Sequence, residues 1–327
     1  MTTSAAESAP APSPLVSIDV IRDAHTAIAP YVHRTPVAGS AYIGERAGAR
    51  VVLKLELFQK TGSFKVRGVI NTLRQLTDDE RARGVISLSA GNHAQALAWG
   101  ARQFGITATI VMPATAVPSK VAATKGYGGN VVQTSDDLLA TALELQRERG
   151  LTLVHPFDDA RVIAGQGTVG LEILAQVPDV SCVIIACGGG GLISGVAAAI
   201  KQSRPSVRVV GVEPSGADVM TRSLAAGAPQ RMAKLDTIAD GLAAPFAGVR
   251  NFAHCQAWVD EWFVVPDEEI VDAMKVLMER TKLFPEAAGA AAVVPLLTGR
   301  LALPSDATVV PIICGGNVDL ARLKALL

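Results

Sequence analysis

The sequence predicts an α/β protein with two domains, built on mostly parallel twisted sheets flanked by helices. β-Branched runs such as VVLKLEL and SCVIIAC alternate with Ala- and Leu-rich stretches along the chain. This alternation is typical of parallel sheets covered by helices on both faces. The length of 327 residues exceeds that of one typical domain. With 49% apolar and 18% charged residues, the composition is that of a compact globular protein.

Charge and cysteine content narrow the classes of partner and compartment. Thirty basic residues balance thirty acidic ones, so no net field favours nucleic acid or a membrane surface, and a small neutral or zwitterionic ligand fits better. The four cysteines lack the spacing of a disulfide framework or a zinc site, which indicates a reduced, cytoplasmic protein. Residues 1–14 are expected to form a flexible tail, and we expect no membrane span.

The first half of the chain predicts a helix and then alternating strands and helices. SIDVIRDAHTAIAPYV has apolar residues at helical spacing, and Pro36 ends that helix. The segments that follow are read alternately as strand and helix: VVLKLEL, VRGVINTLRQL, GVISLSA, HAQALAWGARQFG, ATIVMP, SKVAATKGYG and NVVQT.

The same rhythm returns in the second half, which indicates a second α/β unit. Its segments are SCVIIAC, the helix after GGGG, VRVVGVEP, the amphipathic DEEIVDAMKVLMERT, AAGAAAVVPLLTGR and TVVPIICGG. No internal repeat or low-complexity linker marks a boundary between the two units.

Lys65 is the first candidate for chemistry. In FQKTGSFKVRG it stands between Phe64 and Val66, just before a predicted helix. Partial burial would lower the pKa of such an amine and make it a nucleophile, because desolvation penalises the ammonium form. Most lysines are instead solvated surface groups, so this observation alone leaves both interpretations open.

The segment SCVIIACGGGGLISGVAAAI predicts a buried strand, a four-glycine turn and a helix that begins near Leu192. Consecutive glycines let backbone N–H groups converge on an anion at the positive end of a helix, which predicts a phosphate site. A tight turn without a ligand is the alternative. The glycine spacing matches neither GxGxxG nor GxxxxGK[ST], which disfavours dinucleotide and nucleoside triphosphate binding.

Two further segments place polar groups at the ends of predicted strands. SLSAGNHAQALAW offers Ser89, Gly91, Asn92 and His93 around free helix-start amides, where a carboxylate could bind. The alternative is a capping loop, with Asn92 as the cap and His93 partly exposed. Cys314 ends the strand of VVPIICGGNVDL, at the sheet edge where α/β proteins bind ligands, although a small core residue is the commoner role.

In this order, the four segments resemble the fold-type II pyridoxal-phosphate enzymes with the tryptophan synthase β-like fold. They are most similar to the serine/threonine dehydratase and serine racemase family, and within it to bacterial catabolic threonine dehydratases. The resemblance runs from RTPV at residue 34 to the C-terminus and includes VIAGQGTVGLEIL, VVGVEPSGAD and TIADGLA.

The resemblance implies a role for each matching residue. Lys65 would form the Schiff base with pyridoxal 5'-phosphate and act as the base, with Phe64 against the cofactor and Asn92 on its 3'-oxygen. Cys314 would face the pyridine nitrogen, and Glu286 of LFPEAAGAA would lie near the active site. The phosphate would bind the amides of Gly188, Gly189, Gly190, Gly191 and Leu192. The substrate carboxylate would bind Ser89, Gly91, Asn92 and His93.

The implied function is that of a lyase. Elimination of water from L-threonine, L-serine or a related β-hydroxy amino acid would yield a 2-oxo acid and ammonia. The resemblance also implies a large cofactor-binding domain of residues 15–77 plus 158–327, a small domain of residues 78–157 that closes over the substrate, and a homodimer. The preferred substrate stays open, and Phe157 is either a pocket aromatic or a core residue.

The sequence departs from the family pattern at two places. Racemases of the family carry a second serine before the glycine of the asparagine loop, and here that position is Ala90, which favours dehydration over racemisation. At the family's cation site Glu213 and the carbonyl of Ala217 match, but Val219 stands where an acidic residue is expected. A charged oxygen ligand is thereby lost, which leaves dependence on a divalent or monovalent cation open.

Three alternatives to a dehydratase remain. One is a racemase of the serine racemase type. A second is a β-replacement enzyme like the cysteine synthases, whose loop sequences differ from those here. The third is a ligand sensor without catalytic activity, which would not need Lys65.

Overall fold

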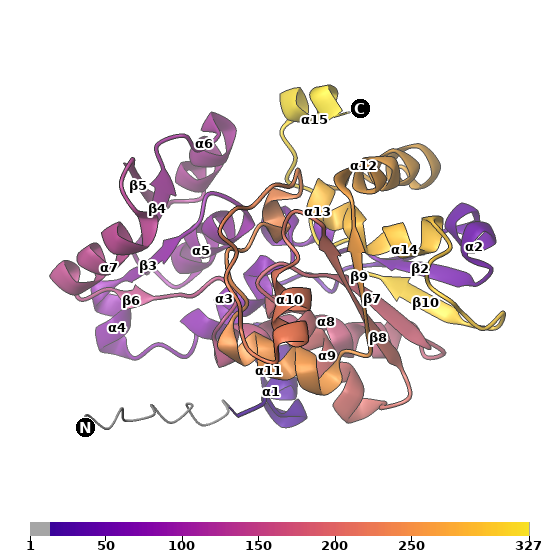
Figure 1. Ribbon diagram of the computed structural model, residues 1–327. Helices are drawn as coiled ribbons and strands as arrows, with labels where there is room; N and C mark the ends of the chain where they lie inside the picture. Colours follow the sequence, from indigo (N-terminus) through magenta and orange to yellow (C-terminus); the bar gives the residue numbers. More distant parts are fainter. Residues whose placement is uncertain (1–13, 327) are drawn as a thin grey trace, which may run out of the picture.

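The computed structural model describes residues 14–326 (Figure 1). The predicted tail, residues 1–14, lies outside the described part of the chain except for Pro14. Two sheets organise the described residues: a six-stranded sheet, and a four-stranded sheet whose strands lie between Val85 and Leu153. The predicted α/β class with mostly parallel sheets is confirmed.

The six-stranded sheet has the order β1-β2-β10-β7-β8-β9. Its strands are β1 (Val37–Gly39), β2 (Arg50–Lys54), β7 (Cys182–Ala186), β8 (Arg208–Pro214), β9 (Glu261–Val265) and β10 (Thr308–Pro311). All pairs are parallel except β1 with β2, which is antiparallel. The last strand along the chain, β10, therefore lies in the interior of the sheet between β2 and β7.

Helices cover both faces of this sheet. The helices outside residues 78–157 are α1 (Ile18–Ile28), α2 (Ala41–Ala47), α3 (Lys65–Leu73), α8 (Ala160–Gln176), α9 (Gly191–Ser203), α10 (Val219–Ala226), α11 (Val249–Trp258), α12 (Asp267–Val276), α13 (Ala287–Ala290), α14 (Val294–Leu297) and α15 (Leu320–Leu326). Short turns of helix are η1 (Glu56–Phe58), η2 (Lys60–Gly62), η3 (Asp240–Leu242), η5 (Ala291–Val293) and the π-helical η4 (Leu277–Thr281). No helix in the described residues is long and apolar enough to cross a membrane.

The four-stranded sheet is wholly parallel and has the order β5-β4-β3-β6. Its strands are β3 (Val85–Leu88), β4 (Ala108–Pro113), β5 (Asn130–Thr134) and β6 (Thr152–Leu153), and its helices are α4 (Asp78–Arg83), α5 (Asn92–Gln103), α6 (Pro118–Gly126) and α7 (Leu138–Arg149). Every one of these elements falls within residues 78–157, the predicted small domain. Its closure over a substrate stays a prediction.

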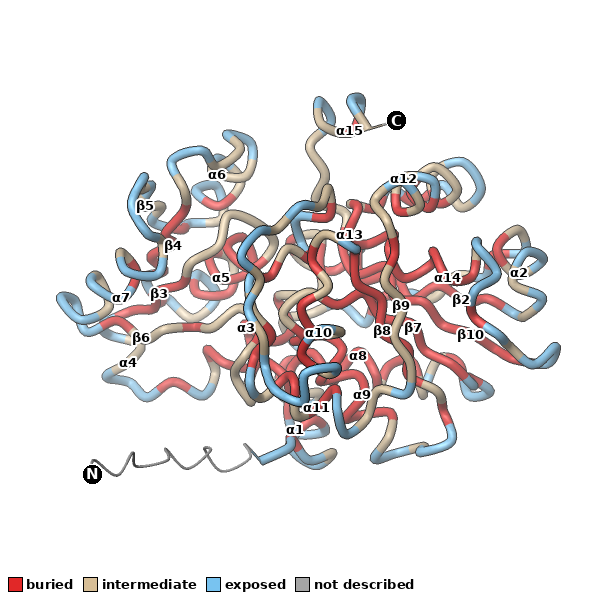
Figure 2. Tube along the Cα trace, viewed as in Figure 1, coloured by how far each residue is buried: buried red, intermediate tan, exposed pale blue. Residues whose placement is uncertain are grey.

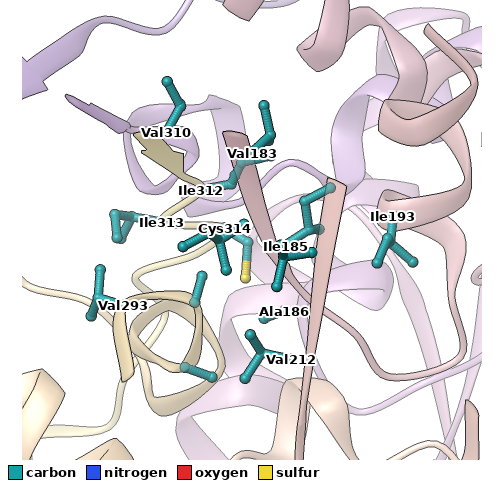
Figure 3. Packing of buried hydrophobic residues seen from close by; sticks show 14 of the residues in the cluster. Val183, Ile185, Ala186, Ile193, Val212, Val293, Val310, Ile312, Ile313 and Cys314 are labelled. Atoms are coloured by element: carbon teal, nitrogen blue, oxygen red, sulfur yellow. The ribbon is translucent and has the colours of Figure 1, made fainter. Parts of the chain in front are cut away.

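The core is divided between the two sheets, and Figure 2 shows buried chain running through both. The larger cluster joins the apolar residues of β7, β8 and β10 to those of α9 and α13, with Cys314 among them (Figure 3). A second cluster packs Val66, Val69 and Ile70 of α3 against Ala94 and Leu97 of α5. Helix α3, which begins at Lys65, is therefore held by apolar contacts to the unit of the four-stranded sheet.

A fully enclosed ionic cluster lies beneath the start of α3. Arg67 binds both Glu56 (Nη2 to Oε1, 2.8 Å) and Glu172 (Nη1 to Oε1, 2.7 Å), and Lys54 Nζ lies 2.6 Å from Glu172 Oε2. All four side chains are at most 2% exposed. Burial alone would raise the pKa of Glu172, but Arg67 and Lys54 outweigh it and lower that pKa. The cluster is neutral as a whole, which is the condition under which buried charges are tolerated.

Most predicted elements are confirmed, with differences at helix ends. The amphipathic segment from Asp267 forms α12 but ends at Val276 and continues as a π-helical turn. AAGAAAVVPLLTGR forms α13, η5 and α14 rather than one helix, with Pro295 at the start of α14. The edge strand β9 was not predicted, although the aromatic and β-branched run EWFVV is a strand signal.

Candidate active site

Three neighbouring strands of the larger sheet bring the candidate residues together. β2 leads through η1 and η2 to Lys65, β10 leads to Cys314, and β7 leads to the four-glycine turn. Because these strands are parallel and adjacent, the loops after them lie at one edge of the sheet. The segments of Lys65 and Cys314 are also joined directly, since Phe64 N donates to the Cys314 carbonyl at 3.2 Å.

Lys65 is the first residue of α3 and is partly buried. Its Nζ donates a hydrogen bond to the carbonyl oxygen of Pro156 at 2.9 Å and lies 5.2 Å from the ring centre of Phe64. Burial lowers the pKa of Lys65 to about 8. A useful fraction of this amine is therefore neutral, and nucleophilic, near neutral pH. The partial burial and lowered pKa expected for Lys65 from its apolar neighbours are therefore present in the structure.

The four-glycine turn runs from β7 into α9, as predicted, and Gly190 is its N-cap with φ +98. Backbone N–H groups of Gly188, Gly189, Gly190, Gly191 and Leu192 donate to no backbone acceptor among the described residues. A Cβ on Gly189 would lie 2.6 Å from the ring of Phe157, and one on Gly188 would lie 2.9 Å from the backbone of Leu242. The turn thus needs glycine on its packed side and presents free donors for an anion.

The loop after β3 forms a second set of free donors. Asn92, His93 and Ala94 begin α5, and their N–H groups donate to no backbone acceptor in the described chain. Ser89 Oγ accepts from Gly91 N at 3.2 Å. The alternative of a capping loop is wrong, because the N-cap is Gly91 and no side chain caps the helix.

His93 is buried, whereas the capping-loop alternative expects it to be partly exposed. It is 3% exposed, and its Nε2 lies 3.1 Å from both Ser87 Oγ and the Val154 carbonyl. Burial, with a smaller effect of Lys65, lowers the pKa of His93 to about 3. The imidazole is neutral and directed toward the strand ends, so its contribution to the loop is its backbone N–H.

Asn92 and Glu286 are in contact, although 194 positions separate them in the chain. Asn92 Nδ2 donates to Glu286 Oε1 at 2.6 Å, and Asn92 Oδ1 accepts from Asn317 Nδ2 at 2.9 Å. Burial raises the pKa of Glu286 to about 7, against the opposing effect of the Asn92 hydrogen bond. Asn317 was not predicted as a site residue.

Cys314 is buried in the loop after β10, because the strand ends at Pro311 rather than at Cys314 as predicted; its Sγ donates to the carbonyl oxygen of Ala288 at 3.4 Å. Burial raises the pKa of this thiol far above its usual range. Cys314 is therefore a neutral thiol, and it lies beside Gly315, where a Cβ would come within 2.4 Å of Glu286 Oε1.

Phe157 is 8% exposed and covers the glycine turn. Its ring also packs edge-on against His155 and tilted against Phe246, with centroid distances of 4.6 and 5.3 Å. These contacts match the expectation that Phe157 is a core aromatic residue rather than a residue that lines the pocket. It nevertheless bears on the site, because its ring packs against the glycine turn.

Glu213 lies at the end of β8, with Ala217 in the turn that follows. Both of its carboxylate oxygens are already bonded: Oε1 accepts from Met220 N at 2.8 Å, and Oε2 accepts from Thr221 N at 2.7 Å. Burial raises the pKa of Glu213 to about 7. No cluster of three or more metal-binding side chains occurs in the described chain. A cation at Glu213 and Ala217 stays a prediction, and it would have to compete with these helix-start amides.

Comparison with known proteins identifies the class. The sequence profile described as "Pyridoxal-phosphate dependent enzyme" matches residues 28–315. This chain therefore belongs to the family of pyridoxal-phosphate dependent enzymes. Within that family it is 42% identical to the L-threonine ammonia-lyase of Thermotoga maritima, over 96% of this chain and 78% of that protein.

Two further comparisons agree. The chain is 42% identical to the L-threonine dehydratase catabolic TdcB of Staphylococcus aureus, over 96% of this chain and 92% of that protein. Its fold matches a solved structure of maize serine racemase with a TM-score of 0.91 and 41% identity, covering 95% of this chain and 97% of that one. The predicted family is confirmed.

The residues present fit pyridoxal phosphate. The glycine turn has free N–H donors for a phosphate, Lys65 is an amine of lowered pKa, and Cys314 is a neutral group on the adjacent loop. Asn92 supplies an amide donor between them, held by Glu286. None of these groups is already occupied in a way that would exclude the cofactor.

Proposed function

We propose that this protein is a lyase that removes the elements of water from L-threonine, L-serine or a related β-hydroxy amino acid and releases a 2-oxo acid and ammonia. The observation that carries the proposal is the placement of Lys65, an amine with a pKa of about 8, among the glycine turn, Cys314 and the free amides of α5. Similarity to an L-threonine ammonia-lyase and an L-threonine dehydratase supports this choice of reaction and substrate.

When bound, pyridoxal phosphate supplies an aldehyde that reacts with amines and a ring that withdraws electrons from the α-carbon of an amino acid. The amides from Gly188 to Leu192 are suited to its phosphate, and Asn92 Nδ2 to its ring oxygen. The neutral thiol of Cys314 provides no negative charge to hold a proton on the pyridine nitrogen. The ring would then withdraw electrons less strongly and would not sustain a long-lived carbanion. Prompt loss of the β-hydroxyl is therefore favoured over reactions that need one.

Lys65 would act twice. Its neutral amine is first the group that carries the cofactor, and after release it takes the α-proton of the substrate. Loss of the α-proton and of the β-hydroxyl leaves an unsaturated amine, and hydrolysis of that amine gives the 2-oxo acid and ammonia. The α5 amides and Ser89 would hold the substrate carboxylate, because a helix start is a favourable anion site.

The test combines covalent labelling with turnover. Reduction of the loaded protein with borohydride and mass spectrometry should find a pyridoxyl group on Lys65. L-Threonine alone, without an added nucleophile, should yield 2-oxobutyrate. Lys65→Ala should lose both, whereas Lys125→Ala, at an exposed lysine of α6, should keep both. A label on another lysine, or turnover that survives in Lys65→Ala, would refute the assignment.

A serine racemase reaction is the second candidate, favoured by the similarity to the maize enzyme. Ala90 speaks against it, since its methyl group has no proton to give to the opposite face of the α-carbon. Formation of D-serine should therefore be slow beside formation of pyruvate. Ala90→Ser should raise D-serine formation relative to pyruvate, and an unchanged ratio would remove position 90 from the explanation.

We also propose a cellular location, an oligomeric state and a domain movement for this enzyme. The described cysteines are free and buried, which supports the cytoplasmic, reducing location expected from their spacing. A homodimer is proposed from the resemblance, with sedimentation analysis as its test. The closing role of residues 78–157 is proposed likewise, with substrate-dependent hydrogen exchange as its test.

A further inference from the structure

Asn92 is linked through Asn317 to the backbone carbonyl of Thr61, a group that can only accept hydrogen bonds. Asn317 Nδ2 donates to the carbonyl oxygen of Thr61 at 2.7 Å. Because a carbonyl oxygen only accepts, the atom of Asn317 that faces it must be the amide nitrogen. The orientation of the Asn317 carboxamide is therefore set by the main chain rather than by another side chain that could rotate.

The orientation of the Asn317 carboxamide determines that of Asn92. The same Asn317 nitrogen lies 2.9 Å from Asn92, so Asn92 must present its oxygen there. Its amide nitrogen then faces Glu286 Oε1 at 2.6 Å. One proton of that nitrogen is used by Glu286, and no acceptor among the described residues takes the second. This second proton is the one available to a ligand.

The loop that contacts Asn317 has an unusual backbone conformation at Thr61 and Gly62. Thr61 has φ +59 and Gly62 φ +73, so two successive residues adopt the left-handed conformation, which is rare for threonine. A Cβ on Gly62 would lie 2.4 Å from Asn317 Oδ1. Gly316 N donates to the Gly62 carbonyl at 3.0 Å and holds the two loops together.

We propose that Asn317 is a positioning residue that fixes the carboxamide of Asn92 with its N–H donors toward Glu286 and the cofactor's ring oxygen. The inference rests on the proposed function, in which Asn92 contacts that oxygen. In this role Asn317 acts through Asn92, which its side chain contacts directly. An acceptor at position 317 would turn Asn92 around and place its oxygen against Glu286 Oε1, where no hydrogen bond can form while Glu286 is ionised.

The test uses Asn317→Asp, which keeps the shape of the side chain but cannot donate from either oxygen when ionised. Asn317→Asp should weaken binding of pyridoxal phosphate to the cofactor-free protein by about tenfold, the effect of one hydrogen bond to a charged group. It should also shift the pH dependence of the bound cofactor's absorption. Asn130→Asp, at an exposed position at the start of β5, is the matched control and should change neither.

A double-mutant cycle separates positioning from a general structural role. In an Asn92→Ala background, Asn317→Asp should change cofactor affinity by no more than roughly twofold, since the residue through which it acts is gone. Unchanged affinity in the single variant, or a full effect in the Asn92→Ala background, would overturn the inference. Loss of the fold in both Asn317→Asp and Asn317→Ala would overturn it too. If the wild-type protein takes no label on Lys65, the proposed function itself fails.

Discussion

Lys65 Nζ donates to the carbonyl oxygen of Pro156, so the candidate catalytic amine is held by the segment that leads out of the four-stranded sheet. The residues around Pro156 make further contacts. The Val154 carbonyl accepts from Ser87 Oγ, Phe157 covers the glycine turn, and the Asp158 carboxylate accepts from the start of α11. Five consecutive residues thus connect the amine, the anion turn and both sheets.

The lowered pKa of Lys65 predicts how its reactivity depends on pH. Burial lowers this pKa from 10.5 to about 8, so the neutral amine predominates above about pH 8 in the cofactor-free protein. The rate of reaction with an aldehyde probe should rise with pH and level off near that value. Quantitative mass spectrometry of Lys65 after brief labelling measures it, with Lys125 in the same digest for comparison. A rate that still rises steeply near pH 10 would contradict the lowered pKa.

Gly189→Ala should damage the anion turn. Its Cβ would come within 2.6 Å of the Phe157 ring, so the turn or the ring must move and the amides lose their alignment. We expect weaker binding of pyridoxal phosphate, by at least about tenfold if one charged hydrogen bond is lost. Gly126→Ala, where a Cβ would meet nothing within 4 Å, is the control. Equilibrium titration of cofactor into both variants makes the comparison.

Glu172→Ala should strongly destabilise the fold. It leaves Lys54 and Arg67 enclosed with only Glu56 to balance them. Removing one partner of a buried ion pair costs about 3–5 kcal/mol of unfolding free energy. Asp179→Ala removes the partner of Arg50 in an exposed pair and should cost less than about 1 kcal/mol. Urea unfolding of the two variants measures both, and similar losses would contradict the assigned difference in burial.

Glu286→Gln should change how stability depends on pH. Burial raises the pKa of Glu286 from 4.5 to about 7, so between those values the folded protein binds a proton that the unfolded chain does not. The cost of the buried carboxylate is therefore full above pH 7 and disappears as pH falls through 4.5. The cofactor-free variant should be more stable than wild type at pH 8, by on the order of 1 kcal/mol, and nearly equal at pH 4.5.

Denaturant unfolding at the two pH values tests this difference. The exposed substitution Glu148→Gln on α7 serves as the control. A stability difference for Glu286→Gln that does not depend on pH would contradict the raised pKa.

Local patterns were sufficient to predict the α/β class, and they marked Lys65 and the glycine turn as candidates for the site. Lys65 stands out because its neighbours are apolar, and the glycine turn stands out because four glycines follow a buried strand. Each of these two signals is contained within a few consecutive residues of the sequence. The resemblance to known enzymes added Glu286 and gave specific roles to Asn92 and Cys314, three residues that short-range patterns alone do not connect.

Other features depend on contacts between distant parts of the chain. Asn317 meets Asn92 across 225 positions, and Lys65 meets Pro156 across 91. An asparagine after two glycines and a proline after a histidine carry no local signal for such contacts. Lys54 and Arg67 likewise look like surface residues until α8 brings Glu172 against them. The edge strand β9 differs from these features, because its aromatic and β-branched sequence EWFVV is itself a local strand signal.

The interior position of β10 has a consequence for biosynthesis. On the ribosome, β2 and β7 emerge long before the strand that must lie between them, so the larger sheet stays divided until Thr308–Pro311 has been made. The loop bearing Cys314 follows that strand. A nascent chain halted earlier would expose two apolar strand edges and lack a complete binding pocket, so capture of the cofactor has to follow the synthesis of Thr308–Pro311 and the loop after it.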